Sequence, residues 1–389
     1  MTDIAHQQSY PPGAHPDLPA PRRLVGPVAW VRDNLFSSPL NIALTIVCAY
    51  LLYKIVPPLL DWTIFSAYWH AGTSNNDCKT AVPGEGVESG TTTMVATGAC
   101  WTMIRARFGI LMYGYYPFSE RWRVDLALAL QFAAMVGLLT EGVPYKKYWA
   151  IFLFIIYPVV AFVLFHGGFG LPVVETHYWG GLMLTLIVAT SGIVAALPIG
   201  VALALGRRSK LPIIRVLSIS FIEFVRGVPL ITILFMSSVV FPLFLPEGMN
   251  FDKLLRAMVG IALFSAAYLA EVVRGGLQAI PKGQYEGAMS LGLSYWKMNA
   301  LIILPQAIQK VIPGIVNSFI GLFMDTTLVL IIGLQELLGQ AQASAHDPNW
   351  LGTENTALAF ISIVYFVFCF AMSRYSQFLE RKLARGYKR

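Results

Sequence analysis

One carboxylate lies in the middle of a long apolar stretch of the chain. Asp325 follows a hydrophobic run and is itself followed by two hydroxyl-bearing residues, Thr326 and Thr327. An ionisable group at such a position is costly in lipid and normally faces a cavity or a partner. Asn317 and Ser318 precede Asp325 by about two helical turns, so they lie near its face of a helix. This set could receive an ammonium group from a solute, or Asp325 could pair with a basic residue of another subunit.

The remaining reactive side chains do not form the pattern that catalysis requires. The sequence has no Cys-x-x-Cys pair and no Cys/His cluster, so we expect no metal site. It also lacks the G-x-x-x-x-G-K-[ST] loop that binds nucleotide phosphates. His166 and His177 lack the spacing of a helical metal pair, and we interpret them as interfacial. We therefore expect no catalytic residue and no cofactor in this chain.

The composition predicts a chain that resides in lipid. Hydrophobic residues make up 56% of it and charged residues 13%, and the mean hydropathy is +0.62. Soluble domains carry about 25% charged residues, so this chain has too little polar surface for a water-soluble globule. Its net charge of +7 lies mainly in short loops, where membrane topology explains it, and we expect no nucleic-acid partner.

Eight apolar runs are long enough to cross a membrane as helices, which takes about 20 residues. Only helices and closed barrels satisfy the backbone in hydrocarbon, so we predict an all-α polytopic membrane protein with about eight transmembrane helices. The predicted spans are Leu40–Leu60, Val124–Thr140, Tyr148–Phe165, Gly180–Leu205, Val228–Leu245 after an amphipathic lead-in at Ile213–Phe224, Leu254–Val273, Ile312–Leu334 and Ala357–Met372. Placing both termini in the cytoplasm puts most loop Lys and Arg residues on that side.

The chain divides into three predicted parts. Residues 1–38 are polar and lack the apolar core of a signal peptide, so we predict a disordered cytoplasmic tail. Residues 39–175 carry three spans and an outer loop, 61–120, and residues 176–389 carry the other five spans. Cys78 and Cys100 lie in the outer loop, where an oxidising compartment would favour a disulfide between them over two free thiols.

A segment between two predicted spans, residues 275–305, is too long for a plain connector. Pro281 and Gly283 break the preceding helix, Gln284–Leu291 predicts a short helix, and Gly292 can end it in the left-handed conformation. We interpret Pro305 as the point where the chain re-enters the membrane. The pattern predicts a short helix held in the cytosol between two spans.

This segment resembles the EAA loop of ABC importer permeases, whose pattern is Glu-Ala-Ala-x3-Gly-x9-Ile-x-Leu-Pro. Six of the seven fixed positions match, and Gly287 stands where the family usually has Ala; the matching residues are Glu286, Ala288, Gly292, Ile302, Leu304 and Pro305. Phe221–Leu230, Ala267–Gln284 and Asp325–Leu328 are similar to the polar amino-acid uptake branch. That resemblance covers residues 178–385, and the additional N-terminal spans resemble the M subunit of general L-amino-acid transporters.

The resemblance implies a five-helix MetI-like core that moves L-amino acids across a bacterial inner membrane by alternating access. It also implies two ATPase subunits that bind ATP and Mg, a second homologous permease subunit and a periplasmic amino-acid-binding protein. In this reading the short helix docks on an ATPase: Gly287, Ala288 and Gly292 permit close approach, Glu286 pairs with a partner arginine, and Tyr285 and Met289 fill an apolar pocket.

Two other features bear on mechanism. Glu223 and Arg226 are three residues apart, as are Glu271 and Arg274, so each pair could form a local ion pair that supports the fold. The main alternative function is an ion-driven secondary transporter of small polar solutes, which would need no EAA loop and would typically contain an internal repeat. No clear repeat is visible in the sequence.

Overall fold

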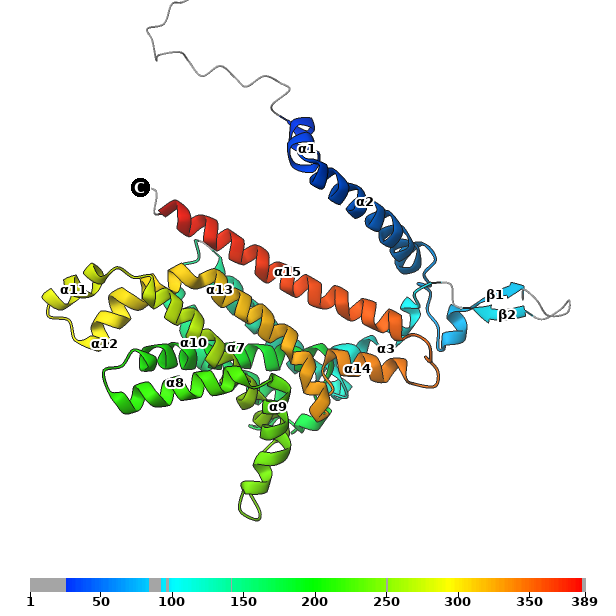
Figure 1. Cartoon of the computed structure of the whole chain (residues 1–389). Helices are drawn as coiled ribbons and strands as arrows, with labels where there is room; N and C mark the ends of the chain where they lie inside the picture. Colours follow the sequence, from blue (N-terminus) through cyan, green and yellow to red (C-terminus); the bar gives the residue numbers. More distant parts are fainter. Residues whose placement is uncertain (1–25, 84–91, 96–97, 141, 250, 387–389) are drawn as a thin grey trace, which may run out of the picture. The chain divides into compact units, whose positions relative to one another are not determined.

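A computed structural model describes residues 26–83, 92–95, 98–140, 142–249 and 251–386 (Figure 1). These residues are mostly helical, and they include seven helices long and apolar enough to cross a membrane, or eight if one bent pair counts as a single span. The predicted all-α polytopic class is therefore confirmed. The chain separates into two compact units, residues 1–67 with 97–99 and residues 68–96 with 100–389.

The smaller unit consists of two helices and a π-helical turn. Helix α1 spans Pro27–Leu35, α2 spans Pro39–Leu60, and the turn continues α2 over Asp61–Phe65. The Ser38 hydroxyl caps α2 by accepting a hydrogen bond from the Asn41 amide at 3.2 Å, and Pro39 is preorganised for the first turn. The disordered-tail prediction is wrong for residues 27–35, which form α1, whereas residues 1–25 lie outside the described residues.

The outer segment of the larger unit is more ordered than a loop. Strands β1 (Thr80–Pro83) and β2 (Thr92–Val95) pair antiparallel, with Thr80 opposite Val95, and α3 spans Trp101–Tyr113. The sequence analysis placed this region in the loop 61–120 and missed α3, because a 13-residue helix with arginines in its second turn lacks the signature of a span.

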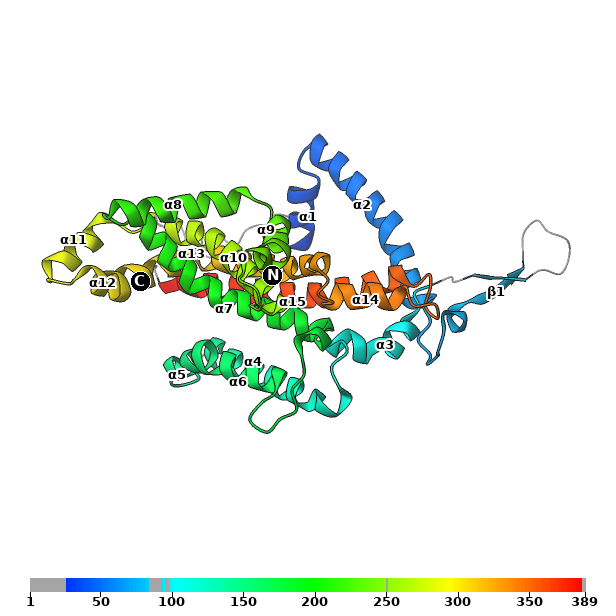
Figure 2. The same cartoon turned by 90° about the horizontal axis from the view of Figure 1, so that it is seen from below.

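A helical hairpin follows. Its elements are α4 (Arg121–Leu139), α5 (Lys146–Ile151), a π-turn (Phe152–Ile156) and α6 (Tyr157–His166). A side chain at Gly137 would overlap the Trp149 ring, so this glycine allows the two arms to approach. The Gln131 amide donates to Thr190 of α7 at 2.6 Å and accepts from Tyr157 at 3.0 Å, which satisfies a polar group inside a span. In Figure 2 the hairpin lies on the opposite side of α7 from α8.

The core is built on three long helices, α7 (Gly181–Arg207), α10 (Lys253–Gln278) and α13 (Leu304–Asp325). Glycines let these helices approach closely, as is common in membranes. A Cβ at Gly200 would lie 2.9 Å from that of Leu269, and one at Gly276 would lie 2.5 Å from the carbonyl oxygen of Ala307. The other core elements are α8 (Pro212–Gly227), α9 (Leu230–Phe235) with its continuation to Phe244, a 3-10 turn (Thr326–Ile332), α14 (Leu337–Ala345) and α15 (Glu354–Gly386).

Pro305 lies within a continuous helical stretch. Helix α12 (Tyr295–Met298) continues through a π-turn (Asn299–Ile303) into α13, so one 38-residue helical stretch runs from Tyr295 to Ile332. The π-turn ends two residues before Pro305, and the wider backbone there accommodates a ring that would clash in a regular helix. The helix that contains the span expected at Ile312 therefore begins at Tyr295. At 38 residues it is longer than the roughly 20 that cross the hydrocarbon, so membrane re-entry at Pro305 stays a prediction.

Candidate functional site: a coupling helix and a polar membrane face

The predicted short helix is present as α11 (Lys282–Ser290), at the end of the core shown in yellow in Figure 1. Pro281 precedes its first turn, and Gly292 ends it with φ of +72°, a conformation that favours glycine. The Gly292 amide donates to the Met289 carbonyl at 2.9 Å and the Leu293 amide donates to Ala288 at 3.3 Å, which satisfies two carbonyls of the last turn. Pro281 and Gly292 therefore set the start and end of the short helix between α10 and α12.

Most of α11 is exposed, and Tyr285 and Ala288 face the rest of the chain. Glu286, Gly287 and Gly292 are exposed, and Met289 is 57% exposed. Ala288 is only 2% exposed and belongs to a buried cluster with Leu277 and Ile303 of its own chain. That its small side chain permits close approach of a partner stays a prediction. The sequence shows which residues occupy α11, but not which of them face inward.

Tyr285 also points to its own chain, through a partner that sequence reasoning missed. The guanidinium of Arg208, at the end of α7, donates to the Tyr285 hydroxyl at 2.9 Å and to the Leu277 carbonyl at 3.0 Å. It also lies over the tyrosine ring, 5.3 Å from the centroid. The Tyr285 hydroxyl itself donates to Leu277 at 3.3 Å. Tyr285 therefore anchors α11 to α7 and α10. That it also fills an apolar pocket in a partner stays a prediction.

The preceding residue, Arg207, joins two further helices. Its Nη1 lies 2.9 Å from a Glu223 oxygen on α8 and 2.6 Å from a Glu271 oxygen on α10. Glu271 also pairs with Arg274 at 2.7 Å, as its spacing predicts. The predicted Glu223–Arg226 pair is not formed within the described chain, because Glu223 turns to Arg207 and Arg226 lies 3.9 Å from Glu271.

The two arginines have complementary effects. Arg207 holds α8 and α10 to the end of α7, and Arg208 holds α11 to the same place. Because the network contains several partly buried charges that share partners, its members are coupled more strongly than an isolated surface pair. The contacts of α11 with Arg208 and Leu277 therefore join it to α7 and α10, and Arg207 extends the network to α8.

A polar stripe on α13 lies in a membrane span. Asn317 is exposed and Asp325 is half-buried, and neither side chain has a hydrogen-bond or ion-pair partner among the described residues. Gly321 lies between them at the four-residue spacing, and a Cβ there would meet open space. Polar groups at membrane depth are costly in lipid and usually face a cavity or a partner, so we expect this stripe to face a water-filled path or another subunit.

Three other predicted path residues use their hydroxyls within the chain. Ser318 donates to the Gly314 carbonyl at 3.0 Å, and Thr327 donates to Met324 at 2.9 Å. Thr326 is buried, donates to Phe323 at 2.7 Å and lies 3.1 Å from the Tyr365 hydroxyl. The structure thus brings Asn317 and Asp325 to one face and turns Thr326 away from them into the core.

Thr326 belongs to a network centred on Glu336, which the sequence analysis did not single out. The buried Glu336 carboxylate accepts from the Gly339 amide at 3.0 Å and the Leu338 amide at 2.9 Å, so it caps α14. Tyr365 and Thr185 donate to it at 3.2 and 3.3 Å. Burial raises the pKa of Glu336, and these hydrogen bonds oppose that rise by stabilising the charged form.

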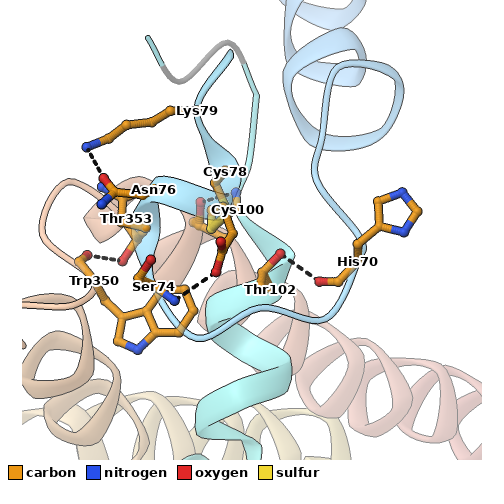
Figure 3. The surroundings of a disulfide bond; sticks show 12 residues. His70, Ser74, Asn76, Cys78, Lys79, Cys100, Thr102, Trp350 and Thr353 are labelled. Carbon is orange, nitrogen blue, oxygen red and sulfur yellow. Dashed lines mark hydrogen bonds between the residues drawn. A yellow bond between two sulfur atoms is a disulfide. The ribbon is translucent and has the colours of Figure 1, made fainter. Parts of the chain in front are cut away.

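A disulfide between Cys78 and Cys100 closes the outer segment (Figure 3). Both cysteines are buried in a cluster with Trp350 and Ala357, which precede and begin the last helix. The Cys100 amide donates to the Thr356 hydroxyl at 3.0 Å, and Arg107 pairs with Asp347 at 2.6 Å. The disulfide therefore holds the outer segment against the start of α15. No group of three potential metal ligands occurs in the described part of the chain.

A bundle of membrane helices that exposes a short helix at one end, with a polar stripe in a span, fits the membrane subunit of a transporter. In agreement, residues 196–385 match the family described as "Binding-protein-dependent transport system inner membrane component". The chain is therefore a non-catalytic membrane component rather than an enzyme.

Two relatives that match over nearly their whole length identify the branch of this family. The chain is 50% identical over 374 residues, covering 96% of it and 97% of the relative, to the inner membrane amino-acid ABC transporter permease protein YhdY of Escherichia coli. It is 39% identical, covering 95% of it and 96% of the relative, to the glutamate/glutamine/aspartate/asparagine transport system permease protein BztC of Rhodobacter capsulatus. A solved amino acid ABC transporter described as containing histidines is 30% identical over 52% of this chain and 92% of its own, with a TM-score of 0.46. The chain belongs to the amino-acid ABC transporter permease family, and it is a multi-pass inner-membrane protein.

Proposed function

We propose that this chain carries L-amino acids inward as one permease subunit of an ATP-driven importer. The observation that carries the proposal is α11, which exposes Glu286, Gly287 and Met289 while Tyr285 and Ala288 fasten it to the membrane helices. A helix that is exposed on one face and fastened on the other is suited to receive force from a docked motor. The names of the full-length relatives support amino acids as the substrate class.

The motor in this proposal is a pair of ATPase subunits, which bind ATP and Mg outside this chain. The sequence supports this division, because it contains no phosphate-binding loop. A second, homologous permease subunit covers the stripe from Asn317 to Asp325, so that the path for the amino acid runs between the two permeases. Asp325 either binds the substrate ammonium group or pairs with a base of that second permease.

The proposed orientation of the chain in the membrane is based on the position of α11. The end that carries α11 faces the cytoplasm, together with both termini, and the disulfide-closed segment faces the periplasm, where a binding protein delivers the amino acid. Loop lysines and arginines at the α11 end support this orientation. In the proposed domain organisation, residues 39–175 add spans to a permease domain formed by 176–389. The ion-driven alternative has no specific observation in its favour.

The test is a charge reversal on the exposed face of α11. Glu286→Arg should abolish co-purification of an ATPase with the tagged protein in mild detergent and should abolish uptake, while leaving membrane insertion intact. Glu247→Arg is the matched control, since Glu247 is exposed in the loop before α10, outside the coupling region. If an ATPase never co-purifies with the wild-type chain, or if Glu286→Arg and Glu247→Arg both transport normally, the proposal is refuted.

A further inference from the structure

A groove between α4 and α15 is not explained by the transport mechanism. Its cavity of about 510 Å³ is lined by the end of α4 and by two residues of α15, namely Phe132, Met135, Val136, Leu139, Thr140, Tyr375 and Phe378. Phe132 is 71% exposed and Phe378 is 45% exposed. The Tyr375 hydroxyl donates to the Leu139 carbonyl at 3.1 Å, which fixes the two helices at the floor of the groove. The walls are therefore apolar and open.

The groove lies at the ends of two membrane spans. The two candidate membrane-spanning helices end at Leu139 and Leu383, and the groove lies along their last turns, so we place it next to the lipid headgroups. Figure 2 shows that α5 and the C-terminal end of α15 lie at the same end of the larger unit as α11 and α12. An occupant of this groove would thus be partly in hydrocarbon and partly at the interface.

Lysine side chains lie beyond the apolar walls of the groove. Lys146 donates to the Leu138 carbonyl at 3.2 Å, so its ammonium group is held beside the groove, and Lys147 follows it on the exposed start of α5. Lys382 lies one turn beyond Phe378 on the same stripe of α15. Glu380 lies two residues from Phe378, about 200° around the helix, and so is on the other side.

We propose that this groove binds an anionic phospholipid, with an acyl chain along the apolar walls and the phosphate between the lysines. An acyl chain matches open walls of Phe, Met and Val, and an anionic headgroup matches the lysines beyond them. Basic pockets between membrane helices on the cytoplasmic side recognise such headgroups in other proteins. The lipid would bridge the N-terminal hairpin and the last core helix, which meet here through the Tyr375 hydroxyl. The proposal does not depend on the identity of the transported solute.

The test compares lipids with the same acyl chains. Full-length wild-type protein in mild detergent is titrated with phosphatidylglycerol or phosphatidylcholine, and bound lipid is counted by native mass spectrometry. Phosphatidylglycerol should bind more tightly. Lys147→Gln/Lys382→Gln should weaken its binding by roughly thirtyfold, from roughly fivefold for each lysine near the surface. The variant retains Lys146, because its ammonium group also donates a hydrogen bond to the Leu138 carbonyl at the end of α4.

Two controls make the result decisive. Lys210→Gln/Arg215→Gln removes the same charge from exposed residues away from the groove and should leave phosphatidylglycerol binding unchanged. Val136→Trp fills the groove and should displace the lipid, whereas Val159→Trp, on an exposed part of α6, should not. The proposal is overturned if both lipids bind equally, if both charge variants lose binding to the same extent, or if Val136→Trp retains the lipid.

Discussion

Replacing Arg208 by alanine is expected to separate ATP hydrolysis from transport. The change removes two hydrogen bonds, to the Tyr285 hydroxyl and the Leu277 carbonyl, and the stacking of the guanidinium on the Tyr285 ring. Hydrogen bonds from charged groups contribute about 1.5–3 kcal/mol and exposed cation–π contacts about 0.5–1 kcal/mol. These ranges sum to at least about 3.5 kcal/mol. Because Arg208 is exposed and water screens its contacts, we take a smaller total of about 2 kcal/mol.

The loss of these contacts lowers the fraction of molecules in which α11 is held against α7. About 2 kcal/mol corresponds to roughly a thirtyfold shift in the equilibrium between the fastened and loosened states. The core should stay folded, because Arg208 lies at the rim and the clusters beneath it are unchanged. The complex of Arg208→Ala with its ATPase partners should therefore hydrolyse ATP at the wild-type rate or faster, while the amount of amino acid moved per ATP falls severalfold.

The assay is paired measurement of ATP hydrolysis and uptake in proteoliposomes. Arg208→Lys keeps the charge over the ring but not the two directed hydrogen bonds, so it should fall between wild type and alanine. Tyr285→Phe keeps the ring and loses the hydroxyl, and combined with Arg208→Ala it should cost less than the sum of the single changes. Arg215→Ala, an exposed change on α8, is the control. Normal uptake per ATP in Arg208→Ala, or an equal loss in Arg215→Ala, would refute the coupling role.

Four further predictions address other parts of the chain. Asp325→Asn should reduce uptake at least tenfold, since the span then lacks its unpaired carboxylate; unchanged kinetics in proteoliposomes would exclude a role in the path. Gly276→Val should destabilise the core by about 1–3 kcal/mol, because a Cβ would overlap a backbone carbonyl of α13, and thermal unfolding in detergent measures this. Replacing Cys78 and Cys100 by serine should lower the stability of the outer segment by about 3 kcal/mol, because the unfolded chain then loses a cross-link over a sequence separation of 22. Proteolysis of this segment should become faster, whereas ATP hydrolysis should not change. The Ser74 and Thr73 amides donate hydrogen bonds to Asp77 and lower its pKa. The stability that Asp77 contributes is therefore present above the unfolded pKa of about 3.9 and is lost as the pH falls through the folded pKa. Proteolysis of this segment should rise below that pH in the wild type and should depend less on pH in Asp77→Asn.

The features that sequence predicted best depend on nearby residues. The position of α11 follows from Pro281 and Gly292, which act on the backbone within a few residues. The spans follow from the length of apolar runs, which the solvent imposes on each segment separately. Cys78 and Cys100 stood out because cysteines are otherwise scarce outside the spans. In each case the physical cause is local or compositional.

The features that sequence missed depend on distant residues. Arg208 and Tyr285 are 77 positions apart, and nothing in either neighbourhood indicates that they meet. Glu336 resembles a surface residue of a polar turn until Thr185 and Tyr365 enclose it. The π-turn before Pro305 was missed because it leaves no pattern in the sequence. These are tertiary effects, and they decide which candidate residues face inward.

The positions of the two polar networks suggest how the ends of the protein communicate. Helix α7 carries Thr185, a donor to Glu336, near its start and Arg207 at its last residue. The two residues are about 33 Å apart along the helix, at 1.5 Å per residue. Between them α7 packs closely on α10 through Gly200, close to Pro198, the proline inside the helix. We expect this packing to carry a displacement at Arg207 and Arg208 to Thr185, from where Glu336 and Tyr365 continue to Thr326 beside Asp325. In the proposed importer, a helix with polar contacts at both ends would thus link the ATPase to the membrane face that bears the carboxylate, without any change of fold.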